Sequence, residues 1–146
     1  MALTKQIEIR PLDSIQGGMA QFYTPQSSHE TMLVTVPGGT IDDLFVHRYQ
    51  TDQLLVVRGS MVLVILQNRR YEYIALSDRS PVVVKIPPGV PHGAINPDSE
   101  PCVLVNAVLR HGAPHDREYQ PLKRPMPYDL GYARSLMRDL TYSKTA

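Results

Sequence analysis

The chain has 146 residues and a mass of 16.4 kDa, with 42% hydrophobic and 20% charged residues. This size fits one globular domain, residues 1–146, and leaves no room for a second catalytic domain. The apolar content is enough for a packed core, which excludes an obligately disordered chain.

The charge pattern narrows the classes of partner. Fifteen Lys and Arg residues stand against fourteen Asp and Glu residues, and the basic residues are scattered along the chain, so we expect no nucleic-acid partner. The apolar run Met61–Leu66 is far shorter than the roughly 20 residues of a membrane span, and the first residues lack a signal-type apolar stretch. The single cysteine, Cys102, lies in an apolar run and is expected to be buried in a reducing compartment. We therefore expect no membrane association and place the protein in the cytoplasm.

Short runs rich in Val, Ile, Leu and Tyr alternate with Pro- and Gly-containing turns along most of the chain. They predict strands at Ile7–Arg10, Met32–Val36, Leu44–Tyr49, Gln53–Arg58, Met61–Gln67, Tyr71–Leu76, Val82–Ile86, His92–Ile95 and Val103–Leu109. Most starts lie roughly 8–12 residues apart, which is typical of an antiparallel sandwich or barrel. The sequence therefore predicts an all-β fold.

The composition changes after about residue 110. Residues 111–146 contain spaced prolines that exclude a central strand, so we expect an ordered C-terminal tail over a barrel core of about residues 31–110. Near the end of the tail, apolar residues recur at helical spacing and predict a short amphipathic helix. These apolar residues are Tyr132, Ala133, Leu136, Met137 and Leu140.

A strand, a tight turn and a second strand are predicted over 84–96, and their spacing is specific. Pro87, Gly89, His92 and Asn96 occupy the pattern Pro-x-Gly-x-x-His-x-x-x-Asn. The segment thereby resembles the second motif of the cupin superfamily. The resemblance implies a cupin-type jelly-roll β-barrel whose cavity holds the site.

The first cupin motif is matched in part. His47, Tyr49, Gln53 and Gly59 stand where that motif has His, His, Glu and Gly. Side chains alternate along a strand, so His47 and Tyr49 are expected to share one face. With Gln53, Leu55 and Val57 turned inward on the next strand, His47, Tyr49, Gln53 and His92 converge in one polar patch, and Asp52 points to the opposite face.

This predicted patch lacks a carboxylate, the usual companion of two histidines at a transition-metal site. We therefore expect no cofactor. The alternative is a divalent transition metal held by a set of four residues. That set is His47, Tyr49, Gln53 and His92.

A narrower resemblance is carried by three segments. His47–Gln50, Val56–Val64 and Ile86–Gly93 are similar to the dTDP-4-dehydrorhamnose 3,5-epimerase family of cupins, and Ala113–Tyr119 is similar to its post-barrel segment. The resemblance implies that His47 removes a proton next to a sugar ketone, assisted by a carboxylate that orients its far nitrogen. It also implies that a tyrosine protonates the opposite face and that His92 lines the floor of the pocket.

The predicted catalytic residues are therefore His47, Tyr49 and His92, with Gln53 as a substrate-binding residue. Asn106 and Arg110 have the same parity on the last strand and are expected to contact the substrate as well, because a guanidinium can clamp a carboxylate or phosphate.

Three functions remain open at this point. The leading one is a sugar epimerase or isomerase acting on a keto-sugar or similar small polar ligand in the barrel cavity. The others are a metal-dependent oxygenase or isomerase and a non-catalytic ligand-binding barrel. We also expect a homodimer, because an N-terminal strand such as Ile7–Arg10 can pair across a two-fold axis.

Overall fold

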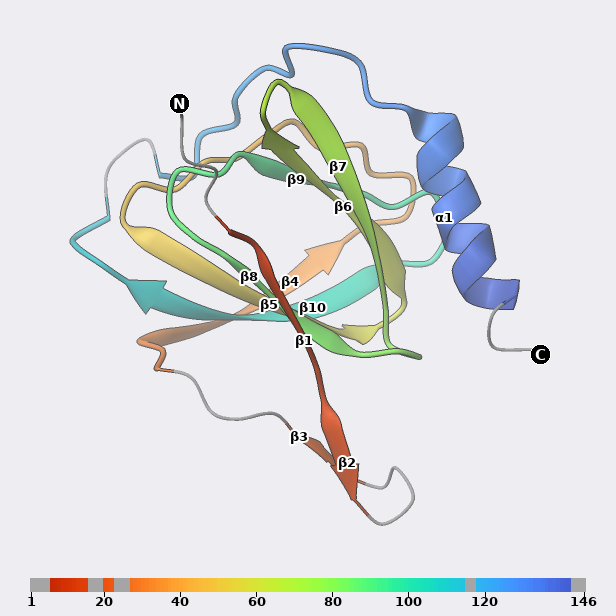
Figure 1. The fold of residues 1–146 in the computed structure, drawn as a ribbon, viewed down its shortest axis with the longest axis horizontal. Coiled ribbons are helices and arrows are strands. Elements are labelled where there is room, and N and C mark those ends of the chain that lie inside the picture. The colour runs from red at the N-terminus through yellow and green to blue at the C-terminus, as the bar shows by residue number, and fades with distance from the viewer. Residues whose placement is uncertain (1–5, 16–19, 23–26, 115–117, 143–146) are drawn as a thin grey trace.

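The computed structural model describes residues 6–15, 20–22, 27–114 and 118–142 (Figure 1). The described chain forms ten strands followed by one helix. In chain order they are β1 (Glu8–Pro11), β2 (Asp13–Ile15), β3 (Ala20–Phe22), β4 (Glu30–Val36), β5 (Gln50–Arg58), β6 (Ser60–Gln67), β7 (Arg70–Ser77), β8 (Val82–Ile86), β9 (His92–Ile95), β10 (Cys102–Arg110) and α1 (Leu130–Tyr142). The all-β prediction with one terminal helix is confirmed.

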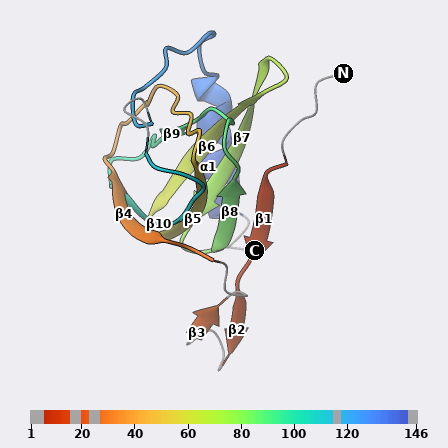
Figure 2. The same ribbon diagram turned by 90° about the vertical axis from the view of Figure 1, so that its left-hand side faces the viewer.

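The strands form two facing antiparallel sheets and a separate hairpin. One sheet has five strands in the order β1-β8-β5-β10-β4, and the other has three in the order β7-β6-β9. The β2–β3 hairpin, which the sequence did not predict, projects from the body below β1 (Figure 2). Helix α1 covers the outside of the three-stranded sheet (Figure 1).

Strand β6 is buried on both faces because it lies between two apolar layers. Its residues Met61, Leu63 and Ile65 pack toward the five-stranded sheet, in the core between the sheets. Val62 and Val64 face the other way and pack with Ala133 and Met137 of α1. This arrangement explains why the run from 61 to 66 is apolar at every position, as in strands covered on both sides.

The inward face of β5 differs from the prediction. Leu54 and Val56 belong to the core between the sheets, so Asp52, two residues earlier, has the same orientation. The prediction that Gln53, Leu55 and Val57 point inward is wrong. The segment Leu54–Val57 is apolar at both parities, so its pattern alone does not show which face is buried.

The predicted strand Leu44–Tyr49 is also wrong. Only two isolated bridges occur there, from Leu44 to Leu122 and from Phe45 to His92. The rest of the segment is a loop that leads into β5. Because alternation does not extend through this loop, His47 and Tyr49 do not share a face.

The turns and the helix agree with their sequence signals. Gly39, Gly59 and Gly89 each have φ near +80°, the conformation that glycine adopts without strain. A side chain at Gly59 would also meet the Pro101 carbonyl oxygen, 2.8 Å from the added Cβ. At the start of α1, Asp129 accepts a hydrogen bond from the Tyr132 amide at 2.9 Å, as an N-cap residue does. No helix within the described ranges is long and apolar enough to cross a membrane.

Candidate active site

Three buried polar residues meet between the two sheets. Asp52 is the third residue of β5, His92 is the first residue of β9 in the facing sheet, and His47 lies on the loop before β5. The bridge between Phe45 and His92 brings that loop to β9. The side chains of Asp52, His47 and His92 are 4%, 8% and 11% exposed, and the centroids of the two imidazole rings are 5.3 Å apart.

Both imidazoles face the same carboxylate oxygen. The Nε2 atom of His92 lies 3.0 Å from Asp52 Oδ2, and the Nε2 atom of His47 lies 3.4 Å from it. The other oxygen, Asp52 Oδ1, accepts hydrogen bonds from the side-chain amides of Gln50 and Asn106. These two donors orient the carboxylate and leave Oδ2 for the imidazoles.

The far nitrogen of each imidazole is held by a main-chain carbonyl. His47 Nδ1 is 2.8 Å from the Glu118 carbonyl oxygen, and His92 Nδ1 is 2.9 Å from that of Val90. The carbonyl favours a proton on Nδ1, while the Asp52 carboxylate, which is also an acceptor, favours one on Nε2, so an imidazolium satisfies both contacts. We assign the single ring proton of a neutral imidazole to Nδ1, where the contact is the shorter of the two. When neutral, each ring therefore directs the lone pair of Nε2 toward Asp52. The orienting carboxylate expected at the far nitrogen of His47 is replaced by the Glu118 carbonyl.

The electrostatics follow from this geometry. Burial alone would lower the pKa of His47, but the hydrogen bond and charge of Asp52, with the Glu118 carbonyl, raise it above the ordinary value of 6.5. Burial alone would raise the pKa of the Asp52 carboxyl, but the two imidazoles outweigh it and hold that pKa far below its usual range. The Asp52 carboxylate therefore stabilises the protonated form of His47.

Two consecutive residues of the C-terminal tail cover this cluster. Glu118 is 1% exposed, while Tyr119 is 46% exposed and its ring lies 5.5 Å from that of His47. The Tyr119 hydroxyl donates to Gln50 Oε1 at 2.8 Å and accepts from Arg110 at 2.7 Å. The sequence analysis selected neither residue as a candidate. The signal that could have found them is the similarity of Ala113–Tyr119 to a post-barrel segment.

The predicted substrate-binding residues have different positions. Asn106 is buried beneath Asp52, and its side-chain oxygen accepts a hydrogen bond from the main-chain amide of Gln53 at 2.9 Å. Arg110 lies at the rim, where its guanidinium pairs with Glu30 at 2.8 Å and donates to Gln50 at 2.6 Å. Asn106 therefore supports the carboxylate, and Arg110 stands closer to solvent.

Two other predicted residues lie outside the cluster. The Gln53 side chain donates to the main-chain oxygens of Ala107 and Ser27, because it points away from the core. Tyr49 is 40% exposed, and its ring packs on Gly112, where an added Cβ would be 3.2 Å from Cδ1. Asp52, expected on the opposite face, occupies the place predicted for Gln53, and Tyr119, not Tyr49, is the phenol whose ring contacts His47.

The donor set also differs from the predicted metal set. One ligand atom each from His47, Asp52 and His92 lies within 4.8 Å of the others. The Gln53 side chain instead points to the main-chain oxygens of Ala107 and Ser27, and the Tyr49 ring packs on Gly112. Two imidazoles and a carboxylate are a set that divalent transition metals bind. In both histidines the other ring nitrogen, Nδ1, donates a hydrogen bond to a main-chain carbonyl, as it does in many metal-binding histidines.

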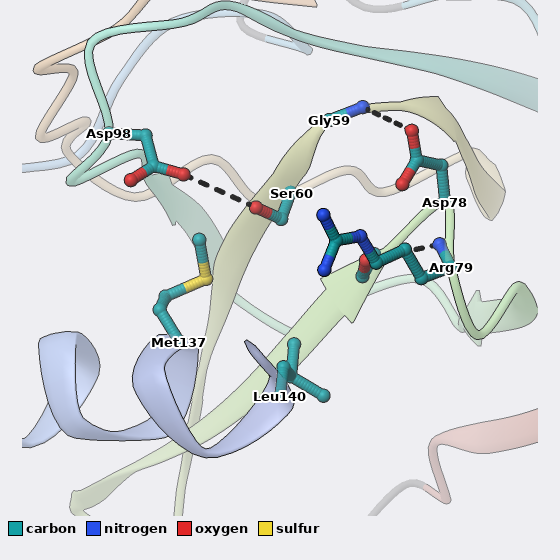
Figure 3. Close-up of a pocket in the computed structure, with 8 residues that line it drawn as sticks. Gly59, Ser60, Asp78, Arg79, Asp98, Met137 and Leu140 are labelled. Carbon is teal, nitrogen blue, oxygen red and sulfur yellow. Dashed lines mark hydrogen bonds between the residues drawn. The ribbon is translucent and has the colours of Figure 1, made fainter. Parts of the chain in front are cut away.

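Two hollows of the described surface lie away from the cluster of His47, Asp52 and His92. One of about 280 Å³ lies between α1 and the turns at Gly59 and Asp78, with Arg79 reaching into it (Figure 3). A shallower groove of about 580 Å³ follows the tail from Lys123 to Leu130. Neither of these two hollows is lined by His47, Asp52 or His92.

Comparison with known proteins defines the class of fold. No protein-family model and no curated protein matches the sequence. Solved structures do match, and the chain has the cupin fold that they share, as the sequence resemblance implied.

Three of these structures illustrate the match. A dTDP sugar isomerase from Desulfovibrio desulfuricans G20 is 18% identical, with a TM-score of 0.65 and 87% of each chain covered. The dTDP-4-dehydrorhamnose 3,5-epimerase from Sulfolobus tokodaii is 14% identical, with a TM-score of 0.62 over 86% of this chain and 85% of that one. The sugar 3,4-ketoisomerase QdtA from Thermoanaerobacterium thermosaccharolyticum, in complex with TDP, is 17% identical, with a TM-score of 0.61 over 89% and 96%.

The Asp52→Asn variant tests the electrostatics of the cluster. Without the carboxylate, the two largest causes that raise the pKa of His47 are lost while burial still lowers it, so the pKa of His47 should fall. In the wild type, the raised pKa stabilises the fold fully below pH 6.5, and this contribution is lost as the pH rises through the folded-state value. Histidine-ring NMR titration measures the shift, with the exposed Asp139→Asn as control. An unchanged His47 titration in Asp52→Asn would show that the carboxylate does not act on this imidazole.

Proposed function

We propose that this protein is an isomerase or epimerase that moves a proton on the carbon next to the ketone of a keto-sugar or similar small polar ligand. The observation that carries the proposal is the geometry of His47, whose Nε2 lone pair faces Asp52 in a buried cluster under Tyr119. The fold supports it, because structures of the same fold include a dTDP sugar isomerase and a 3,5-epimerase.

Each residue of the site has a separate role in the proposed proton transfer. His47 Nε2 accepts the proton from carbon, and the Asp52 carboxylate stabilises the imidazolium that forms. The developing enolate oxygen needs a hydrogen-bond donor, which His92 Nε2 supplies when it is protonated. Tyr119 returns a proton from the other side, since it is the phenol nearest to His47.

The rim residues bear on the class of substrate. Arg110 is the cation nearest to Tyr119 among the described side chains, and its guanidinium already pairs with Glu30. A ligand carboxylate or phosphate at this position would compete with Glu30, whereas sugar hydroxyls would extend the existing hydrogen bonds. We therefore propose a polar keto ligand that binds mainly through hydroxyl and carbonyl groups.

Deuterium exchange tests this function. Incubation in D₂O with free keto-sugars and with TDP-4-keto-6-deoxyglucose should place label on the carbon next to the ketone of the true substrate. His47→Asn should slow labelling by about 10²–10⁴-fold, the usual contribution of a general base. Mass spectrometry measures the label, with the exposed Glu72→Gln as control. Binding without label in the wild type would leave a ligand-binding barrel and remove the isomerase proposal.

A metal-dependent enzyme is the second candidate, and one observation favours it. Three acceptors, two Nε2 lone pairs and Asp52 Oδ2, face one another, and either a proton or a cation can neutralise their repulsion. His47, Asp52 and His92 would hold the ion, which would supply Lewis-acid polarisation of a bound carbonyl.

Cobalt titration separates the two candidates. If the cluster is a metal site, metal-free protein should bind one Co²⁺ per chain with visible ligand-field absorption, and His92→Ala should lose it. Asp139→Asn serves as the control that keeps the cluster intact. Absence of cobalt binding, together with substoichiometric metal in protein purified without chelator, would remove this candidate.

We also propose a homodimer, supported by the outer face of the five-stranded sheet. Leu33, Val105 and Leu55 are neighbours across β4, β10 and β5, and Leu33 is 74% exposed. Strand β1 pairs with β8 of its own chain and lies at the edge of the five-stranded sheet, so pairing of its outer edge across a two-fold axis stays a prediction. Sedimentation at micromolar concentration should show a dimer that Leu33→Glu weakens at least about tenfold, as for a charge placed in an apolar interface. A wild-type monomer would contradict this.

A further inference from the structure

The buried glutamate of the tail has no part in the proton transfer described above. We propose that Glu118 is a positioning residue that fixes the tautomer and orientation of His47 and seats Tyr119 over it, an inference that rests on the proposed function for its catalytic consequence. The proposal concerns the carboxylate of Glu118, which touches neither imidazole through a hydrogen bond.

The burial of this carboxylate is unusual. Glu118 is 1% exposed, and no Lys or Arg forms an ion pair with it within the described ranges. A carboxylate removed from water is costly unless its oxygens accept hydrogen bonds. Here both oxygens do so, one from the Tyr49 amide at 3.0 Å and the other from the Arg48 amide at 3.3 Å.

These two hydrogen bonds fasten the tail to the loop that carries the base. Arg48 and Tyr49 follow His47 directly, so the carboxylate holds the main chain next to the imidazole. The main-chain oxygen of the same glutamate then accepts the Nδ1 proton of His47 at 2.8 Å. One residue therefore grips the loop with its side chain and the ring with its backbone.

This double contact has a chemical consequence. With Nδ1 protonated, Nε2 is the only basic nitrogen of neutral His47, and it is the nitrogen that faces Asp52. If the Glu118 carbonyl moved away, the proton could reside on either nitrogen. A ring with its proton on Nε2 cannot accept another proton there, so the base would be lost in that fraction of molecules.

The neighbouring residue depends on the same anchor. Tyr119 follows Glu118, and its hydroxyl lies between Gln50 and Arg110. Farther along, the tail is held by separate contacts, including the pairing of Leu122 with Leu44 and the bond from the Tyr71 hydroxyl to the Met126 carbonyl. Loss of the Glu118 carboxylate should therefore loosen the roof of the site without releasing the whole tail.

Two substitutions test the proposal at a pH where His47 is neutral. Glu118→Ala removes both acceptors, and Glu118→Gln keeps a similar shape but retains one acceptor oxygen. Long-range ¹H–¹⁵N NMR should show protonated Nδ1 in the wild type. Signals of the Nε2-protonated tautomer should appear in Glu118→Gln and increase in Glu118→Ala. Glu72→Gln, an exposed glutamate on β7, is the matched control and should keep the wild-type pattern.

Kinetics gives the second measurement. Deuterium exchange should fall in the same order, at least about tenfold in Glu118→Ala, mainly through kcat, because the base and not the binding of substrate is affected. Wild-type tautomer signals in both folded variants would overturn the positioning role and leave the proposed function standing. Altered tautomers in a protein that exchanges no ligand proton would support the positioning role and overturn the proposed function.

Discussion

Three hydrogen-bond acceptors that face one another inside the protein are the constraint on which the site depends. In its neutral form, each imidazole donates a hydrogen bond from Nδ1 to a main-chain carbonyl, so both Nε2 lone pairs point at the same oxygen of Asp52. Such an arrangement is stable only with a positive charge among the three atoms. A proton supplies that charge in the proposed isomerase, and a divalent cation would supply it in the alternative.

The three polar side chains of this cluster come from three separate parts of the chain. Asp52 comes from one sheet, His92 from the sheet facing it, and His47 from a loop bridged to the second strand. Around them, the amides of Gln50 and Asn106 satisfy the remaining carboxylate oxygen. The apolar core begins directly beyond, with Leu54 and Val56 on the same face of β5. A water-poor environment and a fully bonded charge are thus built from the same strand.

The tail connects this scaffold to the chemistry. It connects β10 to α1 (Figure 1), and its residues Glu118 and Tyr119 both contact His47. Neither residue belongs to a strand or helix, and both are placed by hydrogen bonds to the barrel. Solved structures with this fold include a dTDP sugar isomerase and a dTDP-4-dehydrorhamnose 3,5-epimerase. Binding residues of proteins often lie on irregular segments that a rigid scaffold positions.

The sequence by itself determined most of the strands, the turns and the position of His92, but neither the β2–β3 hairpin nor the loop that replaces the predicted strand Leu44–Tyr49. Strand composition and Pro-Gly turns are local signals, and His92 directly follows such a turn. The parity of β5 was not determined, because Leu54–Val57 is apolar on both faces and Asp52 and Gln53 are both polar. Tyr49 was misplaced because a loop interrupts the alternation expected after His47. Glu118 lies 71 residues from His47, and only tertiary structure brings the two together. Hydrogen bonds between such distant segments leave no periodic pattern in either one.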